Sequence, residues 1–424
     1  MTIHTLHAES CGCERADVAP GLLALDDALG LCLGQVRALA ETETVPLAEA
    51  VGRGLAEPVR SRSNTPPFTN SAVDGFAIAS ADLQGSGPWI MPISARIAAG
   101  DGLVSLETGT AARIFTGAPV PTGADAVIMQ EDTEIADGRV VLRRSAGKGD
   151  NIRLRGEDMA QGDLVLPAGK RISRRDVGLL AAAGAHEVVV HRPVRVALVV
   201  TGSEVVDPGQ RLAPGQINDV NGPMLQAVMA DPMVEVVVRV SLPDTLQDLG
   251  AAMAALAQSA DLVVTTGGVS VGEEDYLHRA FEIADGTPWF AGVAMKPGKP
   301  ISFGQFEAGA YWLGLPGNPT AAYVGWHVFG RTVISALQDR ACGPRKTIVS
   351  STVDLHHKPG RCEFRPAQLD GVDAEGRILA TPVQTTQSGR VLPLAQADGV
   401  MLIPADADHM PKGALFEFLP FDDQ

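Results

Sequence analysis

The most regular pattern of apolar and polar positions lies in the second half of the chain. Several segments there carry apolar residues at spacings of three and four, the period of a helix with one buried face. They alternate with short apolar runs typical of buried strands. The strand runs cover 194–200, 234–241, 261–266, 288–295 and 310–315, and the helical segments cover 221–230, 245–258, 273–284 and 320–337. This alternation predicts an open, doubly wound α/β sheet with parallel strands and helices on both faces.

Shorter signals divide the remainder of the chain. A helical period is present over 22–41, and strand-like pieces separated by glycine and proline fill 63–155. After residue 344 the pattern is all β. The sequence therefore predicts a multi-domain protein of α/β plus β class. Its predicted parts are a flexible tail at 1–19, a discontinuous linking α+β region at 20–62 and 156–193, a β-rich lobe at 63–155, an α/β domain at 194–343 and a C-terminal β domain at 344–424.

The charge of the chain is acidic overall but uneven. Lys and Arg number 34 against 50 Asp and Glu, a net charge of −16. This balance argues against nucleic-acid binding, because non-specific affinity for nucleic acid depends on cations that neutralise phosphates. Residues 139–175, however, hold ten Lys and Arg against four acids. Local positive charge of this kind leaves room for a small anionic ligand.

The sequence carries no signal for export or for a membrane. Its first residues form no basic leader followed by an apolar stretch. No run approaches the ~18 apolar residues that a membrane helix needs. The five cysteines are odd in number and scattered, which favours reduced thiols over a disulfide framework. We therefore expect a cytoplasmic protein that contacts no membrane.

Glycine-rich and polar turns follow the predicted α/β strands. Open α/β sheets bind ligands outside the carboxyl ends of their strands, where these turns lie. Glycines let backbone N–H groups approach an anion, lysines neutralise it, and carboxylates suit Mg²⁺ beside phosphate. The turns thus predict a phosphorylated ligand. Its candidate binding residues are Thr201, Gly202, Ser203, Gly267, Gly268, Ser270, Gly272, Pro316, Gly317, Asn318 and Pro319, with cations Lys296 and Lys299 and metal ligands Glu204, Asp219, Glu274 and Asp275.

The turns do not match the common phosphate-binding motifs. Neither GxxxxGK[ST] nor GxGxxG is present, so a P-loop or a standard dinucleotide fold is not indicated. Residues 268–272 do fit G-x-S-x-G, which leaves a serine hydrolase with Ser270 as nucleophile as an alternative. That alternative lacks a well-placed base, because His327 falls inside a predicted helix.

Eight motifs together resemble one known family. They are NTPPFTNSAVDGFAI (64–78), GAPVPTGADAVIMQED (117–132), NIRLRGEDM (151–159), TGSEVV (201–206), IND (217–219), TTGGVSVGEEDYL (265–277), MKPGKP (295–300) and GLPGNP (314–319). In this order they are similar to the molybdenum insertases, the molybdopterin molybdenumtransferase family of MoeA and gephyrin E-domain type. The resemblance extends over nearly the whole chain beyond its first ~20 residues.

The resemblance implies a fold and a reaction. The α/β domain would be like molybdopterin adenylyltransferase and the C-terminal domain would be a β-barrel. The protein would form a homodimer whose cleft is shared between the subunits. It would insert molybdate into the dithiolene of adenylylated molybdopterin, with Mg²⁺-dependent release of AMP. Molybdopterin adenylyltransferase and molybdoenzyme acceptors would be partners, and nucleic acid would not.

The resemblance also implies roles for individual residues. Asp74 and Asp158 would be acids of the shared cleft, and Glu204 and Asp275 would hold Mg²⁺ and phosphate. Lys296, Lys299, Pro316, Pro319 and Arg361 would face molybdate and the pterin phosphate. Two serines frequent in the family are replaced, near Ala321 and near Leu392 or Pro393. A second alternative is therefore a non-catalytic paralogue that binds molybdopterin or serves as a scaffold.

Overall fold

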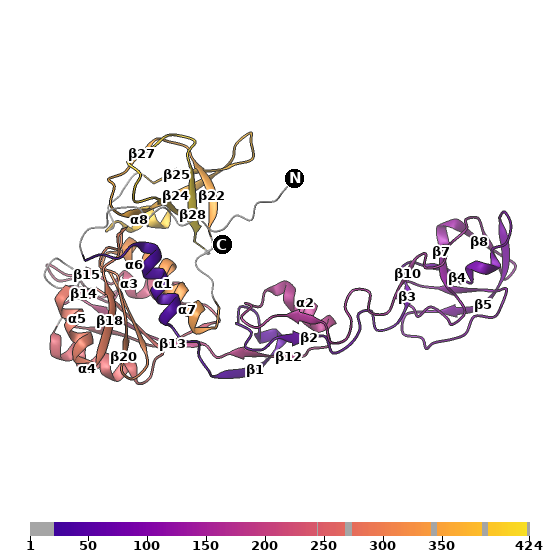
Figure 1. Ribbon diagram of the computed structural model, residues 1–424, viewed down its shortest axis with the longest axis horizontal. Coiled ribbons are helices and arrows are strands. Elements are labelled where there is room, and N and C mark those ends of the chain that lie inside the picture. The colour runs from indigo at the N-terminus through magenta and orange to yellow at the C-terminus, as the bar shows by residue number, and fades with distance from the viewer. Residues whose placement is uncertain (1–20, 244, 268–273, 341–345, 384–388, 422–424) are drawn as a thin grey trace. The chain divides into compact units, whose positions relative to one another are not determined.

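The computed structural model describes residues 21–243, 245–267, 274–340, 346–383 and 389–421. The chain forms two compact units, whose elements Figure 1 labels. Unit 1 comprises Met1–Glu43, Gly52–Ala56 and His191–Gln424, and unit 2 comprises Thr44–Val51 and Glu57–Val190.

Unit 1 contains a six-stranded α/β sheet in the order β16-β13-β17-β21-β20-β18. Its strands are β13 (Val194–Thr201), β16 (Val234–Leu242), β17 (Leu262–Thr266), β18 (Gly286–Ala291), β20 (Ser302–Phe306) and β21 (Tyr311–Leu315). The first four in sheet order are parallel, whereas β20 runs antiparallel to both of its neighbours. The expectation of an all-parallel sheet is therefore wrong. The sequence missed β20 because its residues, SFGQF, form no continuous apolar run. It also joins β21 through a hairpin, so no crossover helix marks it.

Helices cover both faces of this sheet, as expected for a doubly wound domain. They are α3 (Asn221–Val228), α4 (Leu246–Ala257), α5 (Glu274–Ile283), α6 (Pro319–Gly325), the π-helical segment Trp326–Gly330 and α7 (Arg331–Leu337). Successive strand residues point to opposite faces. Val196 and Leu198 thus join a core with α3, α6 and α7, and Ala197 and Val199 join another with α4 and α5 (Figure 1).

The first helix, α1 (Leu25–Gln35), adds Leu25, Ala28 and Cys32 to the core of unit 1. The predicted linking region includes this helix, and in the structure it contacts α7. Burial raises the pKa of the Cys32 thiol to about 12, so this free cysteine is inert at neutral pH. Cys362 is disulfide-bonded, so the expectation of reduced thiols is wrong for that residue.

The C-terminal strands of unit 1 close into a five-stranded barrel. They are β22 (Thr347–Ser351), β24 (Cys362–Val372), β25 (Ile378–Pro382), β26 (Gly399–Ile403) and β28 (Leu415–Pro420). Pairing of β24 with both β25 and β26 completes the ring, so the expected β-barrel is confirmed. The two-residue strand β19 (Met295–Lys296) lies parallel to β24, and the short helix α8 (Val391–Ala395) precedes β26.

Smaller elements complete unit 1. Strand β14 (Val205–Val206) pairs with β15 (Ile217–Asn218), and β23 (Leu355–His356) pairs with β27 (His409–Met410). No helix of the described segments is long and apolar enough to cross a membrane.

Unit 2 contains the predicted β-rich lobe, a six-stranded sheet in the order β7-β4-β6-β5-β9-β8. Its strands are β4 (Gly75–Ile78), β5 (Trp89–Ile97), β6 (Ala111–Ile114), β7 (Ala126–Met129), β8 (Thr133–Ala136) and β9 (Arg139–Leu142). Short pairs carry the chain to and from it: β1 (Thr42–Pro46) with β12 (Glu187–His191), β2 (Val59–Arg60) with β11 (Leu164–Leu166), and β3 (Asn70–Ser71) with β10 (Ile152–Arg153). Helix α2 (Arg174–Ala182) begins at a capping box of Ser173 and Asp176.

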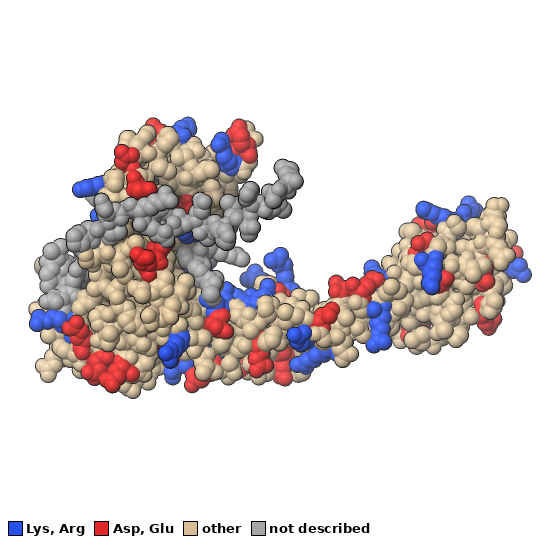
Figure 2. All heavy atoms as spheres, in the orientation of Figure 1, with Lys and Arg blue, Asp and Glu red and all other residues tan. Residues whose placement is uncertain are grey.

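The basic stretch of the sequence lies in unit 2, where neighbouring acids partly neutralise it. Arg144 lies 3.8 Å from Asp132, and Lys170 lies 3.3 Å from Asp176. Figure 2 shows Lys and Arg interspersed with Asp and Glu on the visible face of this unit. On that face the two signs of charge are mixed rather than gathered into one basic patch.

Candidate functional site

Three parallel strands of unit 1 end at the same edge of the sheet. The register pairs Val200 of β13 with Thr266 of β17, and Thr266 with Leu315 of β21. The turns that begin at Gly202, Gly267 and Pro316 therefore start side by side. We call these three turns the strand-end edge.

Glycine is required at the centre of this edge. Gly267 has φ +120°, and a Cβ placed there would lie 2.0 Å from the Thr201 carbonyl oxygen. A Cβ on Gly317 would lie 3.3 Å from the Gly267 Cα. The backbones of adjacent turns approach each other this closely only because neither carries a side chain.

Asn221, at the start of α3, ties the turns together. Its Nδ2 donates to the Thr266 hydroxyl at 2.9 Å and to the Gly317 carbonyl at 2.7 Å. The Thr266 hydroxyl in turn donates to the Pro316 carbonyl at 3.0 Å. Sequence reasoning missed both side chains, although an asparagine two residues after the IND motif was a usable signal.

Two buried polar atoms at this edge have no hydrogen-bond partner among the described residues. They are the Thr201 hydroxyl and the Asn221 Oδ1, in residues that are 2% and 7% exposed. Buried polar atoms are nearly always satisfied in native proteins. Both atoms are therefore suited to a polar group of a ligand.

The acids predicted to bind metal are placed differently from one another. Glu204 is exposed and forms no ion pair within the described segments. Asp219 is buried and already bonded, since it accepts from the Gly222 amide at 2.8 Å and from Arg239 at 2.6 Å. Over the described ranges no three His, Cys, Asp or Glu side chains are grouped to hold a metal ion. A metal role for Asp219 stays a prediction, one that requires Arg239 to move.

Several predicted residues lie outside what the structure describes. Gly268, Ser270 and Gly272 are not among the described residues. Glu274 and Asp275 form the start of α5, directly after that segment, and only their backbone is described.

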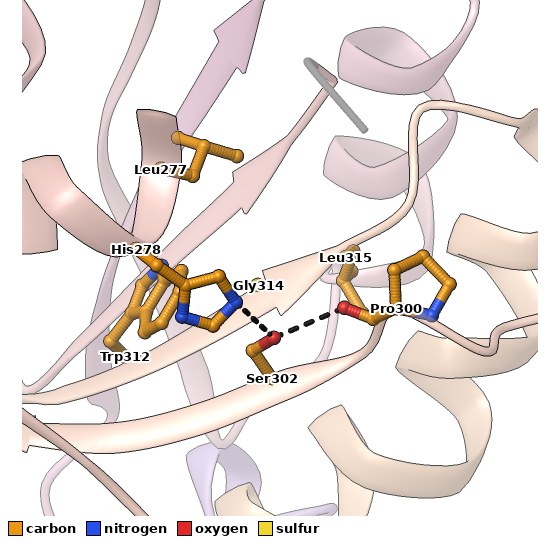
Figure 3. Close-up of a pocket in the computed structure, with 7 residues that line it drawn as sticks. All are labelled: Leu277, His278, Pro300, Ser302, Trp312, Gly314 and Leu315. Carbon is orange, nitrogen blue, oxygen red and sulfur yellow. Dashed lines mark hydrogen bonds between the residues drawn. The ribbon is translucent and has the colours of Figure 1, made fainter. Parts of the chain in front are cut away.

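The KPGKP loop, residues 296–300, connects the barrel to the strand-end edge. Lys296 on β19 lies beside β24 of the barrel, where its Nζ is 3.4 Å from Glu363 Oε2. At the other end of the loop, Pro300 lines the same small pocket as Leu315, the last residue of β21. His278 and Ser302 meet in this pocket at 2.9 Å (Figure 3).

Two further cations stand at this junction without a partner in the described part of the chain. Lys299 is exposed and Arg361 is half-buried, and neither takes part in an ion pair there. Cations without a protein partner favour an anionic ligand. Sequence reasoning found both, but it missed Glu363 and Arg365, which lie two residues apart on β24 and so share one side of that strand.

The remaining two predicted acids, Asp74 and Asp158, belong to unit 2. Asp158 is exposed. Asp74 Oδ1 accepts from the Thr116 amide at 2.8 Å and from the Thr116 hydroxyl at 2.7 Å. Both bonds favour the charged carboxylate, the bond from the amide more than the bond from the hydroxyl. They hold the pKa of Asp74 below its ordinary value. Asp74 is therefore ionised at neutral pH.

Removing the Thr116 hydroxyl tests whether its hydrogen bond lowers the pKa of Asp74. In Thr116→Val the backbone amide still donates but the hydroxyl does not, so we expect the pKa of Asp74 to rise toward its ordinary value. An NMR titration of the Asp74 carboxyl carbon measures the change. The matched control is Thr133→Val, because the Thr133 hydroxyl bonds the Gln130 carbonyl rather than an acid. If the titration midpoint of Asp74 is the same in Thr116→Val as in the unmodified protein, the hydroxyl does not lower its pKa.

Three family models match the chain in order along it. The MoeA N-terminal region (domain I and II) matches residues 23–184. A probable molybdopterin binding domain matches residues 197–336, and the MoeA C-terminal region (domain IV) matches residues 349–421. A molybdopterin molybdenumtransferase from Haemophilus influenzae is 36% identical over 405 residues, which cover 95% of this chain and 99% of that relative. The chain belongs to the molybdopterin molybdenumtransferase family.

Other members match over a similar extent. Molybdopterin molybdenumtransferase 2 of Mycobacterium tuberculosis is 37% identical over 87% of this chain and 93% of its own. The crystal structure of the molybdopterin biosynthesis MoeA protein from Pyrococcus horikoshii OT3 is similar with a TM-score of 0.82 and 27% identity, covering 94% of this chain and 100% of that one. The family resemblance and the fold class predicted from the motifs are thus confirmed.

Proposed function

We propose that this member of the family inserts molybdate into the dithiolene of adenylylated molybdopterin and releases AMP. Membership of the family makes the protein an enzyme of molybdenum cofactor biosynthesis. The observation that carries the finer proposal is the KPGKP loop, which connects the glycine turns of the strand-end edge to the cations Lys296, Lys299 and Arg361 beside the barrel.

The residues of unit 1 divide into two sets by their chemistry. The glycine turns would take polar groups of the pterin nucleotide, together with the Thr201 hydroxyl and Asn221 Oδ1, which have no hydrogen-bond partner in the described part of the chain. Lys296, Lys299 and Arg361 would hold the molybdate and phosphate oxygens. Donors that are already in place stabilise negative charge as it develops when the bond to AMP breaks.

Mg²⁺ fits this site through few protein ligands. Mg²⁺ is usually bound by one or two carboxylates together with substrate phosphates. The exposed Glu204 meets that requirement, and Glu274 and Asp275 at the start of α5 would add to it. When bound, the ion would offset the charge of the phosphate oxygens. Asp219 accepts from the Gly222 amide and from Arg239, so it would join the metal ligands only if Arg239 moved.

We also propose a cytoplasmic homodimer, in which Asp74 and Asp158 of one subunit face the strand-end edge of the other. Family membership supports this arrangement. We keep the predicted domain boundaries as part of the same proposal.

The test is a complete assay with purified protein, adenylylated molybdopterin, molybdate and Mg²⁺. We expect AMP release that requires both molybdate and Mg²⁺, together with a product that activates a cofactor-free molybdoenzyme. Parallel reactions without molybdate and with EDTA are the controls. If the pterin binds but no AMP is released under any of these conditions, the catalytic proposal is wrong.

Pterin binding without AMP release would favour the non-catalytic alternative. The alternative is motivated by the replacement of two serines frequent in the family, near Ala321 and near Leu392. In the structure Ala321 is only 2% exposed within α6, and Leu392 is 70% exposed in α8. The serine hydrolase alternative has no support from the family, and its nucleophile, Ser270, is outside the described residues.

A further inference from the structure

Glu363 is a buried carboxylate at the point where the KPGKP loop meets the barrel. Its side chain is only 4% exposed. Oε1 accepts from Arg365 Nε at 3.1 Å and lies 3.0 Å from Arg365 Nη2. Oε2 lies 3.4 Å from the Lys296 ammonium. Each oxygen thus has a different cationic partner.

This geometry follows from the strand pairing. Lys296 of β19 is the register partner of Glu363 on β24. Residues two apart on a strand share one face, so Arg365 lies on the same side as Glu363. Arg365 is held in place in turn, because it also donates to the His356 carbonyl at 3.2 Å. The contact of Arg365 with Oε1 therefore fixes the carboxylate and leaves Oε2 directed to Lys296.

His357 completes the surroundings of the carboxylate. Its Nδ1 lies 2.8 Å from the Ala407 carbonyl, a contact in which the ring nitrogen must donate. Its Nε2 is 3.8 Å from Glu363 Oε2, too far for a hydrogen bond. Lys296 is therefore the close partner of that oxygen.

Lys296 itself remains accessible. Its side chain is 39% exposed, and an ammonium group carries three donors. The 3.4 Å ion pair with Glu363 leaves N–H donors of the ammonium for another group. A lysine stem is flexible and is ordered only at a cost in entropy. An anchor that fixes the ammonium before an anion arrives removes part of that cost from binding.

We propose that Glu363 is a positioning residue for oxyanion binding: through Oε2 it holds the Lys296 ammonium at the junction of the barrel and the KPGKP loop, ready for a tetrahedral oxyanion of the molybdate class. This inference rests on the proposed function and adds a residue that the motifs did not indicate.

Glu363→Gln tests the inference, because it keeps the shape of the side chain but removes its charge. Isothermal titration with molybdate alone measures the dissociation constant. We expect the constant to rise about tenfold, as when an outer partner that orients a ligand-holding side chain is removed. The matched control is Glu417→Gln, which removes the 2.6 Å ion pair with Lys346 elsewhere in the barrel and should leave the constant unchanged.

A double variant that also carries Lys296→Ala separates positioning from a general structural effect. If Glu363 acts through Lys296, adding Glu363→Gln to Lys296→Ala should weaken molybdate binding no further. An equal additional loss in the double variant would overturn the inference. If Glu363→Gln folds poorly, as judged by its thermal unfolding midpoint, Glu363→Asp replaces it. The shorter acid retracts the carboxylate from Lys296, so weaker binding supports the inference and an unchanged constant overturns it.

The same titration distinguishes the two proposals. If the unmodified protein binds no molybdate, the proposed function fails and this inference fails with it. If the unmodified protein and Glu363→Gln bind molybdate equally, this inference alone fails.

Discussion

Replacing Lys299 by alanine is expected to lower molybdate-dependent AMP release by about 100-fold. Lys299 is exposed, and its ammonium has no ion-pair partner within the described residues. Its charge is therefore free to meet the oxygens of an anion. Because the side chain is not packed in the core, we expect the thermal unfolding midpoint to stay unchanged. Steady-state kinetics of AMP release measures the effect.

A second exposed lysine of unit 1 provides the control for Lys299. Lys412 lies in the turn between β27 and β28, outside the junction of barrel and loop. Lys412→Ala removes one positive charge from the same unit, so equal losses in the two variants would mean that net charge matters rather than position. Full activity of Lys299→Ala would exclude Lys299 from the binding of molybdate and phosphate.

Gly267→Ala is expected to destabilise unit 1 by about 3 kcal/mol. The new methyl group would start 2.0 Å from the Thr201 carbonyl oxygen, on a backbone with φ +120°. Both the strained dihedral and the overlap must be relieved by separating β13 from β17, whose strand ends carry the turns of the strand-end edge. We therefore expect weaker binding of adenylylated molybdopterin together with the loss of stability. Urea unfolding and a binding titration measure the two effects.

The hairpin between β20 and β21 offers a control that isolates the overlap. Gly309 also has a positive φ, +96°, but a Cβ there would meet nothing within 4 Å. Gly309→Ala carries only the dihedral strain, about 1 kcal/mol, and lies at the opposite edge of the sheet from the strand-end edge. If both variants lose the same stability, the close approach of Gly267 to Thr201 is not the cause.

The sequence predicted much of this protein from local signals. The period of apolar residues indicated the helices of the α/β domain, because each helix buries one face. Short apolar runs indicated its parallel strands, which are buried in the sheet. The glycine turns were recognisable for a similar reason, since Gly202 and Gly267 need backbone angles that other residues avoid. The cations Lys299 and Arg361 were found from the motifs, whose residue types suit an anion.

Contacts between distant segments could not be predicted from such local signals. Asp219 was predicted as a metal ligand from its carboxylate chemistry, and nothing local indicated its ion pair with Arg239, a residue of a different element. The antiparallel β20 was missed because its sequence, SFGQF, is interrupted by a glycine and a glutamine and forms no continuous apolar run. Neither feature has a signature within a window of neighbouring residues.

By itself, the sequence determined the element types, the glycine turns and the family. Only the tertiary structure decided which charges are free and which are held. Barrel closure and the pairing of β19 with β24 bring Lys296 to Glu363. They leave Lys299 and Arg361 without a described ion-pair partner. The physical reason is that periodicity reports which face of an element is buried, whereas the partner of a charge depends on strand pairing between segments far apart in the chain.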